Sequence, residues 1–290
     1  MQNPTVAGLD PKLDYVPEFI KEECFAKYGK TLEGAAAALF EFNKALIDAL
    51  YEVVPAIKPQ AAYYEMYGWH GVKALADTIA YAKSKGMFVI TDGKRNDIGT
   101  TMEAYAAAHL GSTTVAGEEV EAFGADALTV NGYLGTDGIK PLVNICKSGD
   151  KGIFVLVKTS NPSSGELQDK KLDDGTTVYE QMGKMCEEWG TELEGKYGYS
   201  GVGAVVGATY PEQLAEMRAK CPHTFFLVPG YGAQGGGAND VKNAFDENGL
   251  GAIINSSRGI MCAWKKQGLT ENDFAKAAYN EAVRMRDEII

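Results

Sequence analysis

One stretch of this chain contains a complete strand-to-helix transition: MFVITDGKRNDIGTT, from Met87 to Thr101. Its first four residues are apolar, which is typical of a buried parallel strand. Strand side chains alternate between two faces, so Asp92 and Lys94 would point the same way if the strand continues that far. Asp97 follows near the start of the next helix. A lysine held between aspartates stays protonated and suits a proton donor, although a lone run of this kind is more often an ordinary salt bridge.

The same transition recurs along the chain. Apolar, β-branched runs predict eight strands, over Thr5–Leu9, Ala56–Pro59, Met87–Thr91, Ala127–Asn131, Ile153–Val157, Val202–Val206, Phe225–Val228 and Ala252–Asn255. Helical patterns fill the intervals, over Gly34–Val54, Gly71–Lys85, Thr101–His109, Gly138–Lys147, Val178–Lys196, Pro211–Lys220, Ala238–Glu247 and Glu271–Arg286. This alternation predicts an α/β fold, a (β/α)8 TIM barrel, with a doubly wound sheet as the alternative. No linker or repeat divides the chain, so we expect residues 1–290 to form a single domain.

Composition narrows the class of partner. The 290 residues carry 28 Lys and Arg against 39 Asp and Glu, a net charge of −11, which argues against nucleic-acid or acidic-membrane binding. The five cysteines and three histidines are scattered and form no metal-ligand pattern, so we expect reduced thiols and no metal site. No basic-apolar leader and no apolar run of about 18 residues occurs, which makes the cytoplasm the expected location.

Polar residues gather at the predicted strand ends. In a barrel the carboxyl ends of all strands open onto one face, so these side chains would converge there. Each one alone is more often a helix cap, but together they form a candidate centre. They are Asp10, Lys58, Gln60, Asp92, Lys94, Thr159, Ser160, Gln234 and Arg258.

Two consecutive segments late in the chain suggest a phosphate site. PGYGAQGGG spans Pro229 to Gly237, and NSSRGI spans Asn255 to Ile260. Barrels commonly bind phosphate after strands seven and eight, glycines let backbone N–H groups approach the oxygens, and Arg258 offers a two-pronged donor. The polar loop Asn161–Thr177 after strand five is either a solvated excursion or a lid over the substrate.

These segments resemble orotidine 5′-phosphate decarboxylases, particularly the longer bacterial type. The resemblance rests on GLDP (Gly8–Pro11), IKPQ (Ile57–Gln60), DGKRNDIGTT (Asp92–Thr101), KTSNP (Lys158–Pro162), PGYGAQG (Pro229–Gly235) and SRG (Ser257–Gly259). It implies a homodimeric barrel without metal or organic cofactor. The implied reaction converts orotidine 5′-monophosphate to uridine 5′-monophosphate, the last step of UMP synthesis.

The resemblance also implies a role for each matching residue. Asp92 would sit against the substrate carboxylate, and Lys94 would protonate C6 of the pyrimidine as carbon dioxide leaves. Lys58 would join this charged network and, with Asp10, hold the ribose hydroxyls. Asp97 and Thr101 would cross the subunit interface to complete the neighbouring site.

The remaining matches would bind substrate. Ser160 would bind the pyrimidine amide, Gln234 and Arg258 would hold the 5′-phosphate, and Gln60 and Thr159 would line the same site.

Two other functions fit parts of the pattern. A related barrel, a magnesium-dependent sugar-phosphate decarboxylase or synthase, shares the Asp92-to-Asp97 element, and sensitivity to a chelator would favour it. A non-catalytic protein that binds a phosphate ligand could use the same scaffold. Adjacent carboxylates give a mere binder no advantage, so the enzyme is the preferred interpretation.

Overall fold

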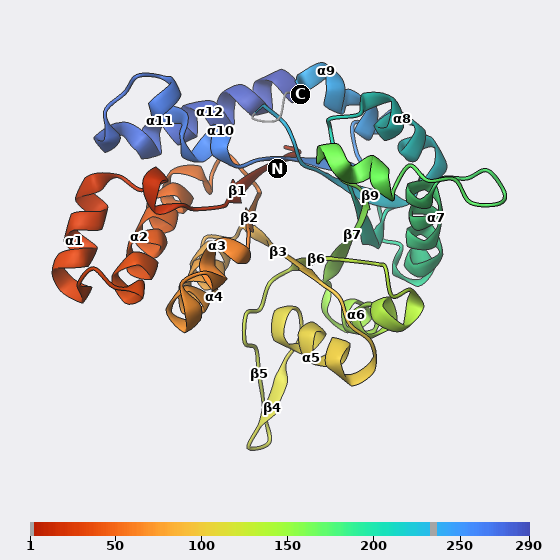
Figure 1. Cartoon of the computed structure of the whole chain (residues 1–290), viewed down its shortest axis with the longest axis horizontal. Coiled ribbons are helices and arrows are strands. Elements are labelled where there is room, and N and C mark those ends of the chain that lie inside the picture. The colour runs from red at the N-terminus through yellow and green to blue at the C-terminus, as the bar shows by residue number, and fades with distance from the viewer. Residues whose placement is uncertain (1–2, 233–236) are drawn as a thin grey trace. The chain divides into compact units, whose positions relative to one another are not determined.

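Eight strands carry the fold in a computed structural model that describes residues 3–232 and 237–290 (Figure 1). They are β1 (Thr5–Leu9), β2 (Ala56–Pro59), β3 (Phe88–Arg95), β6 (Ala127–Val130), β7 (Gly152–Lys158), β8 (Ser200–Val206), β9 (Thr224–Val228) and β10 (Ala252–Ser256). Their hydrogen-bonded order is a closed barrel, β1-β10-β9-β8-β7-β6-β3-β2. The predicted (β/α)8 barrel is therefore confirmed, and the doubly wound sheet is excluded because an open sheet has two edges.

The chain divides into two compact units, Met1–Gly93 with Ser256–Ile290, and Lys94–Asn255. The helices of the first unit are α1 (Glu18–Tyr28), α2 (Leu32–Leu50), α3 (Ala62–Glu65), α4 (Gly68–Ser84), α10 (Arg258–Met261), α11 (Ala263–Lys266) and α12 (Phe274–Ile289). Those of the second are α5 (Gly99–His109), α6 (Thr136–Gly149), α7 (Val178–Gly190), α8 (Pro211–Lys220) and α9 (Ala238–Val241). No helix of the described part of the chain is both long and apolar enough to cross a membrane.

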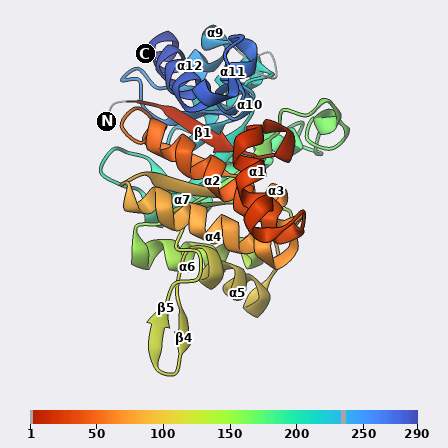
Figure 2. The same ribbon diagram turned by 90° about the vertical axis from the view of Figure 1, so that its left-hand side faces the viewer.

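Helix α2 supplies much of the core of the first unit. Thr31 caps its start, its side chain accepting a hydrogen bond from the Gly34 amide at 3.1 Å. One face of the helix is fully buried, and Phe42 on that face packs against Phe274 of α12 with ring centroids 5.3 Å apart. Helices α1 and α4 also pack against α2 (Figure 2). The sequence pattern did not predict α1, because only Ile20 and Cys24 of that helix are buried.

The second unit is built on β7, which pairs in parallel with β6 and β8. Its helix α7 ends at Gly190, short of the predicted Lys196, and a 3-10 turn over Thr191–Leu193 follows it. The end of α7 lies close to β8, since a Cβ at Gly190 would be 2.2 Å from Ser200 Oγ. A two-stranded hairpin that was not predicted, β4 (Thr113–Val115) with β5 (Glu118–Val120), projects beyond α5 and α6 (Figure 2).

The Phe42 site gives a direct test of the core in the first unit. Replacing Phe42 with Ala should lower the free energy of unfolding by about 3–5 kcal/mol, since a buried ring leaves a cavity. Urea titration followed by circular dichroism measures this. The control is Phe19→Ala: Phe19 also faces Phe274, with centroids 6.5 Å apart, but is 41% exposed and should cost much less. Equal losses from both substitutions would contradict this assignment of the core.

Candidate active site

A buried ion pair occupies the strand ends of the first unit. Lys58 of β2 and Asp92 of β3 lie with Nζ 2.7 Å from Oδ2, and both residues are buried. Burial lowers the pKa of Lys58, but the charges of Asp92 and Asp10 more than offset this, so the pKa lies above its ordinary value. A raised pKa keeps the ammonium charged throughout the neutral range. Lys58 thus supplies a permanent positive charge at the mouth of these strands, in contact with Asp92.

Backbone hydrogen bonds hold the ends of β1, β2 and β3 together. The Gln60 amide donates to the Leu9 carbonyl at 3.1 Å, and the Ala61 amide donates to the Asp92 carbonyl at 3.2 Å. Asp10 follows β1 directly, and its Oδ1 is one of the buried oxygens without a hydrogen-bond partner among the described residues. A buried, unpaired carboxylate oxygen is costly, so this atom is suited to accept a hydrogen bond from a ligand.

Gln60 has a local structural role. Its side-chain Oε1 accepts a hydrogen bond from the Ala62 amide at 3.2 Å, at the start of α3. This bond ties the Gln60 side chain to the first residue of α3.

Tyr64 of α3 forms a hydrogen bond to the end of β1, a contact that was not predicted from the sequence. Its hydroxyl lies 3.4 Å from the Leu9 carbonyl and accepts a hydrogen bond from Asn43 Nδ2 at 2.8 Å. Asn43 in turn donates to Thr78 Oγ1 at 3.2 Å. This buried network joins α2, α3 and α4 to the residue that precedes Asp10. A tyrosine in a four-residue helix carries no sequence signal for such a role.

Arg258 begins α10, immediately after β10, and its side chain is exposed. Helix α10 packs against β1, the strand that precedes Asp10. The predicted partner Gln234 lies outside the described residues.

Lys94 has an unusual backbone. Of the three described non-glycine residues with positive φ, Ala116 lies in the hairpin turn and Asp150 at a helix end, whereas Lys94, with φ of 47°, lies within strand β3. Its amide donates to Thr129 Oγ1 of β6 at 3.1 Å, and the residue is exposed. Strand β3 does extend to position 94, but the alternation rule assumes extended backbone and does not apply there. Non-glycine residues held in this region cluster at functional sites.

The segment after Lys94 contains Asp97 and Thr101, the two residues expected at a subunit interface. Asp97 is half-buried, and its Oδ1 accepts a hydrogen bond from the Ile98 amide at 2.8 Å. Thr101 is exposed in the first turn of α5. Ile98, between them, is 51% exposed despite its apolar side chain.

Thr159 and Ser160 follow β7 and are both half-buried. The Gln168 side chain forms two hydrogen bonds with Thr159. Its Oε1 accepts one from the Thr159 backbone amide at 2.9 Å, and its Nε2 donates one to Thr159 Oγ1 at 2.8 Å. Gly207, after β8, lies so close that a Cβ there would be 2.9 Å from the Ser160 Cβ. Glycine is thus required at 207 for this approach, and neither Gln168 nor Gly207 was identified from the sequence.

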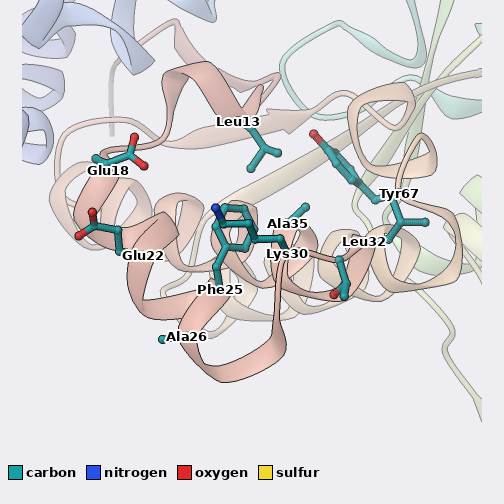
Figure 3. Close-up of a pocket in the computed structure, with 10 residues that line it drawn as sticks. Leu13, Glu18, Glu22, Phe25, Ala26, Lys30, Leu32, Ala35 and Tyr67 are labelled. Carbon is teal, nitrogen blue, oxygen red and sulfur yellow. The ribbon is translucent and has the colours of Figure 1, made fainter.

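A separate pocket of the first unit, about 1000 Å³ in volume, contains none of the predicted site residues. Residues of α1, the start of α2 and Tyr67 line it. Figure 3 shows the carboxylates of Glu18 and Glu22 at one end and Tyr67 at the other.

Comparisons with known proteins give a consistent family. The model of the orotidine 5′-phosphate decarboxylase/HUMPS family matches residues 35–268. An orotidine 5′-phosphate decarboxylase of Rhodopirellula baltica is 45% identical over 289 residues, covering 98% of this chain and 93% of that protein. One from Caldicellulosiruptor bescii is 43% identical over 284 residues, covering 98% and 92%.

Solved structures that resemble this chain have names from the same family. Leishmania donovani OMP decarboxylase superimposes with a TM-score of 0.71 at 32% identity, covering 99% of this chain and 94% of that one. Leishmania donovani UMP synthase gives a TM-score of 0.73 at 33% identity over 98% of this chain, which spans 54% of the UMP synthase chain.

Gly207 offers a test of the close approach at Ser160. Gly207→Ala should lower the free energy of unfolding by about 1–3 kcal/mol, because the added methyl overlaps the Ser160 side chain and backbone. Gly149→Ala is the matched control, since a Cβ there would meet its nearest atom at 3.4 Å, an ordinary contact. Chemical denaturation compares the two, and an unchanged stability in Gly207→Ala would refute the tight approach.

Proposed function

Because this chain belongs to the orotidine 5′-phosphate decarboxylase/HUMPS family, we propose that it converts orotidine 5′-monophosphate to uridine 5′-monophosphate and carbon dioxide. The observation that carries this assignment is the 45% identity to a curated orotidine 5′-phosphate decarboxylase over nearly the whole of both chains. The magnesium-dependent sugar-phosphate activity is not favoured, since the relatives that match over this length are orotidine 5′-phosphate decarboxylases.

Asp92 and Lys58 supply the electrostatics of the proposed reaction. Lys58 fixes Asp92 at 2.7 Å in a buried position, so the carboxylate cannot swing away from an incoming anion. Two carboxylates about 4 Å apart at an effective dielectric of about 20 repel by about 4 kcal/mol. Loss of carbon dioxide removes the substrate carboxylate, and the repulsion with it. The bound substrate is thereby raised in free energy relative to the product.

Lys94 is the proposed proton donor. When the bond between C6 and the carboxyl carbon breaks, its electron pair stays on C6 and carbon dioxide departs. The Lys94 ammonium stabilises the developing carbanion and then transfers a proton to C6, which gives the uridine ring and a neutral lysine. The mechanism uses only residues of this protein, with no cofactor.

The remaining residues bind and orient the nucleotide. Asp10 accepts a hydrogen bond from a ribose hydroxyl, since its Oδ1 has no hydrogen-bond partner among the described residues. Ser160 binds the pyrimidine amide, and Arg258 binds the 5′-phosphate through its planar, two-pronged guanidinium. Gln60, Thr101, Thr159 and Gln234 complete the binding site in this proposal.

A homodimer is part of the same proposal. Asp97 and Thr101 flank the exposed Ile98, and a Cβ at Gly138 would lie 2.9 Å from the Asp97 carbonyl and 3.6 Å from Leu134 Cβ. Leu134 and its neighbour Tyr133 are 44% and 75% exposed. An exposed apolar patch beside polar residues is typical of a surface that another protein covers. We assign this patch to contact with a second copy, in which Asp97 and Thr101 reach the neighbouring site.

Two broader expectations belong to the proposal as well. One is that residues 1–290 form a single domain, which the closed strand order supports. A cytoplasmic location is consistent with five cysteines that are all buried free thiols.

Lys94→Ala tests the proposed chemistry. It should lower kcat for decarboxylation by at least about 10²–10⁴-fold, the usual contribution of a positioned proton donor, while uridine 5′-monophosphate still binds. Carbon dioxide release measures turnover, and calorimetry measures product binding. The exposed Lys140 serves as control, and Lys140→Ala should retain wild-type turnover. Near-normal turnover in Lys94→Ala would refute the assignment.

Mixing two inactive variants tests the shared site. Lys94→Ala and Asp97→Ala dimers, combined in equal amounts and allowed to exchange subunits, should recover about a quarter of wild-type specific activity. Half of the dimers become mixed, and one of the two sites in each mixed dimer contains neither substitution. If Asp97 serves the site of its own subunit, no site is restored and the mixture stays inactive.

A further inference from the structure

The end of β7 contains a buried ammonium that the proposed mechanism does not use. Lys158, the last residue of this strand, has a side chain only 1% exposed. Its Nζ lies 2.7 Å from Asp169 Oδ1 and donates to Ser164 Oγ at 3.0 Å. The ring of Tyr210 lies 4.8 Å from the same nitrogen. Burying an ammonium is unfavourable unless its donors are paired, so these contacts make up a defined binding position for the charge.

The strand itself is irregular at this point. Leu156 pairs with Val205 but Lys158 pairs with Val206, so β7 contains one extra residue. Such a bulge redirects the side chain that follows it and is common beside active sites. The Lys158 carbonyl also accepts a hydrogen bond from the Gly207 amide at 2.8 Å, which anchors the backbone at the end of β7.

The partners of Lys158 belong to the loop Asn161–Thr177. Ser164 lies in its short 3-10 helix, Pro162–Glu166, and Asp169 follows Gln168, the residue that grips Thr159 through two hydrogen bonds. The backbone amide of Gln168 also donates a hydrogen bond to the Ser164 carbonyl at 2.9 Å. Fixing Ser164 and Asp169 therefore fixes Gln168, and through it Thr159. The loop is tied back onto the strand that it leaves.

We propose that Lys158 is a positioning residue for the decarboxylation: its buried ammonium ties this loop to the end of β7 so that Thr159 and Ser160 are held ready for the pyrimidine. This inference rests on the proposed function, which assigns Ser160 to the pyrimidine amide. Lys158 acts through Gln168 and the loop, not by contact with the substrate.

Lys158→Met is the direct test, because methionine keeps the length of the side chain and removes its charge. We expect kcat/KM to fall by about tenfold to a hundredfold, the effect of a misplaced binding group. Inhibition by inorganic phosphate should be unchanged, since the proposed phosphate ligand, Arg258, is not part of this loop. The matched control is Lys151→Met: Lys151 adjoins the other end of β7 and donates to the Ala125 carbonyl at 2.8 Å. It should keep wild-type kcat/KM.

Two further measurements separate positioning from general weakening. Hydrogen exchange at the Thr159 amide should be faster in Lys158→Met than in the wild type or in Lys151→Met. In a Ser160→Ala background, Lys158→Met should lower kcat/KM little further, because both substitutions then remove the same interaction. Additive losses, or a weaker phosphate inhibition of the same size, would overturn the proposal.

Asp169→Asn covers the case in which Lys158→Met does not fold. The Asp169 side chain is 42% exposed, so this change perturbs the core less, yet it removes the ion pair. A smaller drop in kcat/KM with faster Thr159 exchange supports the proposal, and wild-type values of both overturn it. If the wild type releases no carbon dioxide from orotidine 5′-monophosphate, the proposed function fails, while the exchange experiment still decides whether Lys158 holds the loop.

Discussion

The ion pair between Lys58 and Asp92 is the constraint on which the first unit depends. Neither charge tolerates burial without the other, and the two meet because β2 and β3 lie side by side in the barrel. The same contact that stabilises these strand ends therefore also fixes a carboxylate at the place where the reaction is proposed. The charges of Asp92 and Asp10 both raise the pKa of Lys58, so the ammonium between them stays charged.

The second unit uses a buried lysine for a different purpose. Lys58 and Lys158 both extend from the ends of parallel strands, and both pair with an aspartate at 2.7 Å. Asp92 is part of a strand and scarcely exposed, whereas Asp169 belongs to a loop and is half open to solvent. The first pair holds a carboxylate between two strands, and the second ties a loop to the end of a strand. Similar ion pairs thus position a charge in one unit and hold a loop in place in the other.

The strands were predictable because parallel strands buried on both faces are continuous apolar runs. Two of the eight match their observed bounds at both ends, and the ends of the others differ by at most four residues. The last helix was expected from Glu271, but α12 begins at Phe274 after a 3-10 turn. Most of the predicted site residues were chosen because they directly follow strands. The contacts of Lys158, Gln168 and Gly207 could not be predicted in this way, because they depend on the tertiary structure: a buried lysine looks like any other lysine in sequence. The left-handed backbone at Lys94 likewise has no local signal, since glycine or asparagine would be expected there.

The hairpin of β4 and β5 has all six strand residues exposed, and each of its strands has an outer edge that no described strand covers. Such edges invite strands of other molecules to add to them, the first step of aggregation. Glu118 and Glu119 lie on one of these strands, with Glu121 just beyond it. Two hairpins that approach edge to edge would bring these carboxylates together. Like charges on the exposed edge oppose such edge-to-edge pairing between copies of the hairpin.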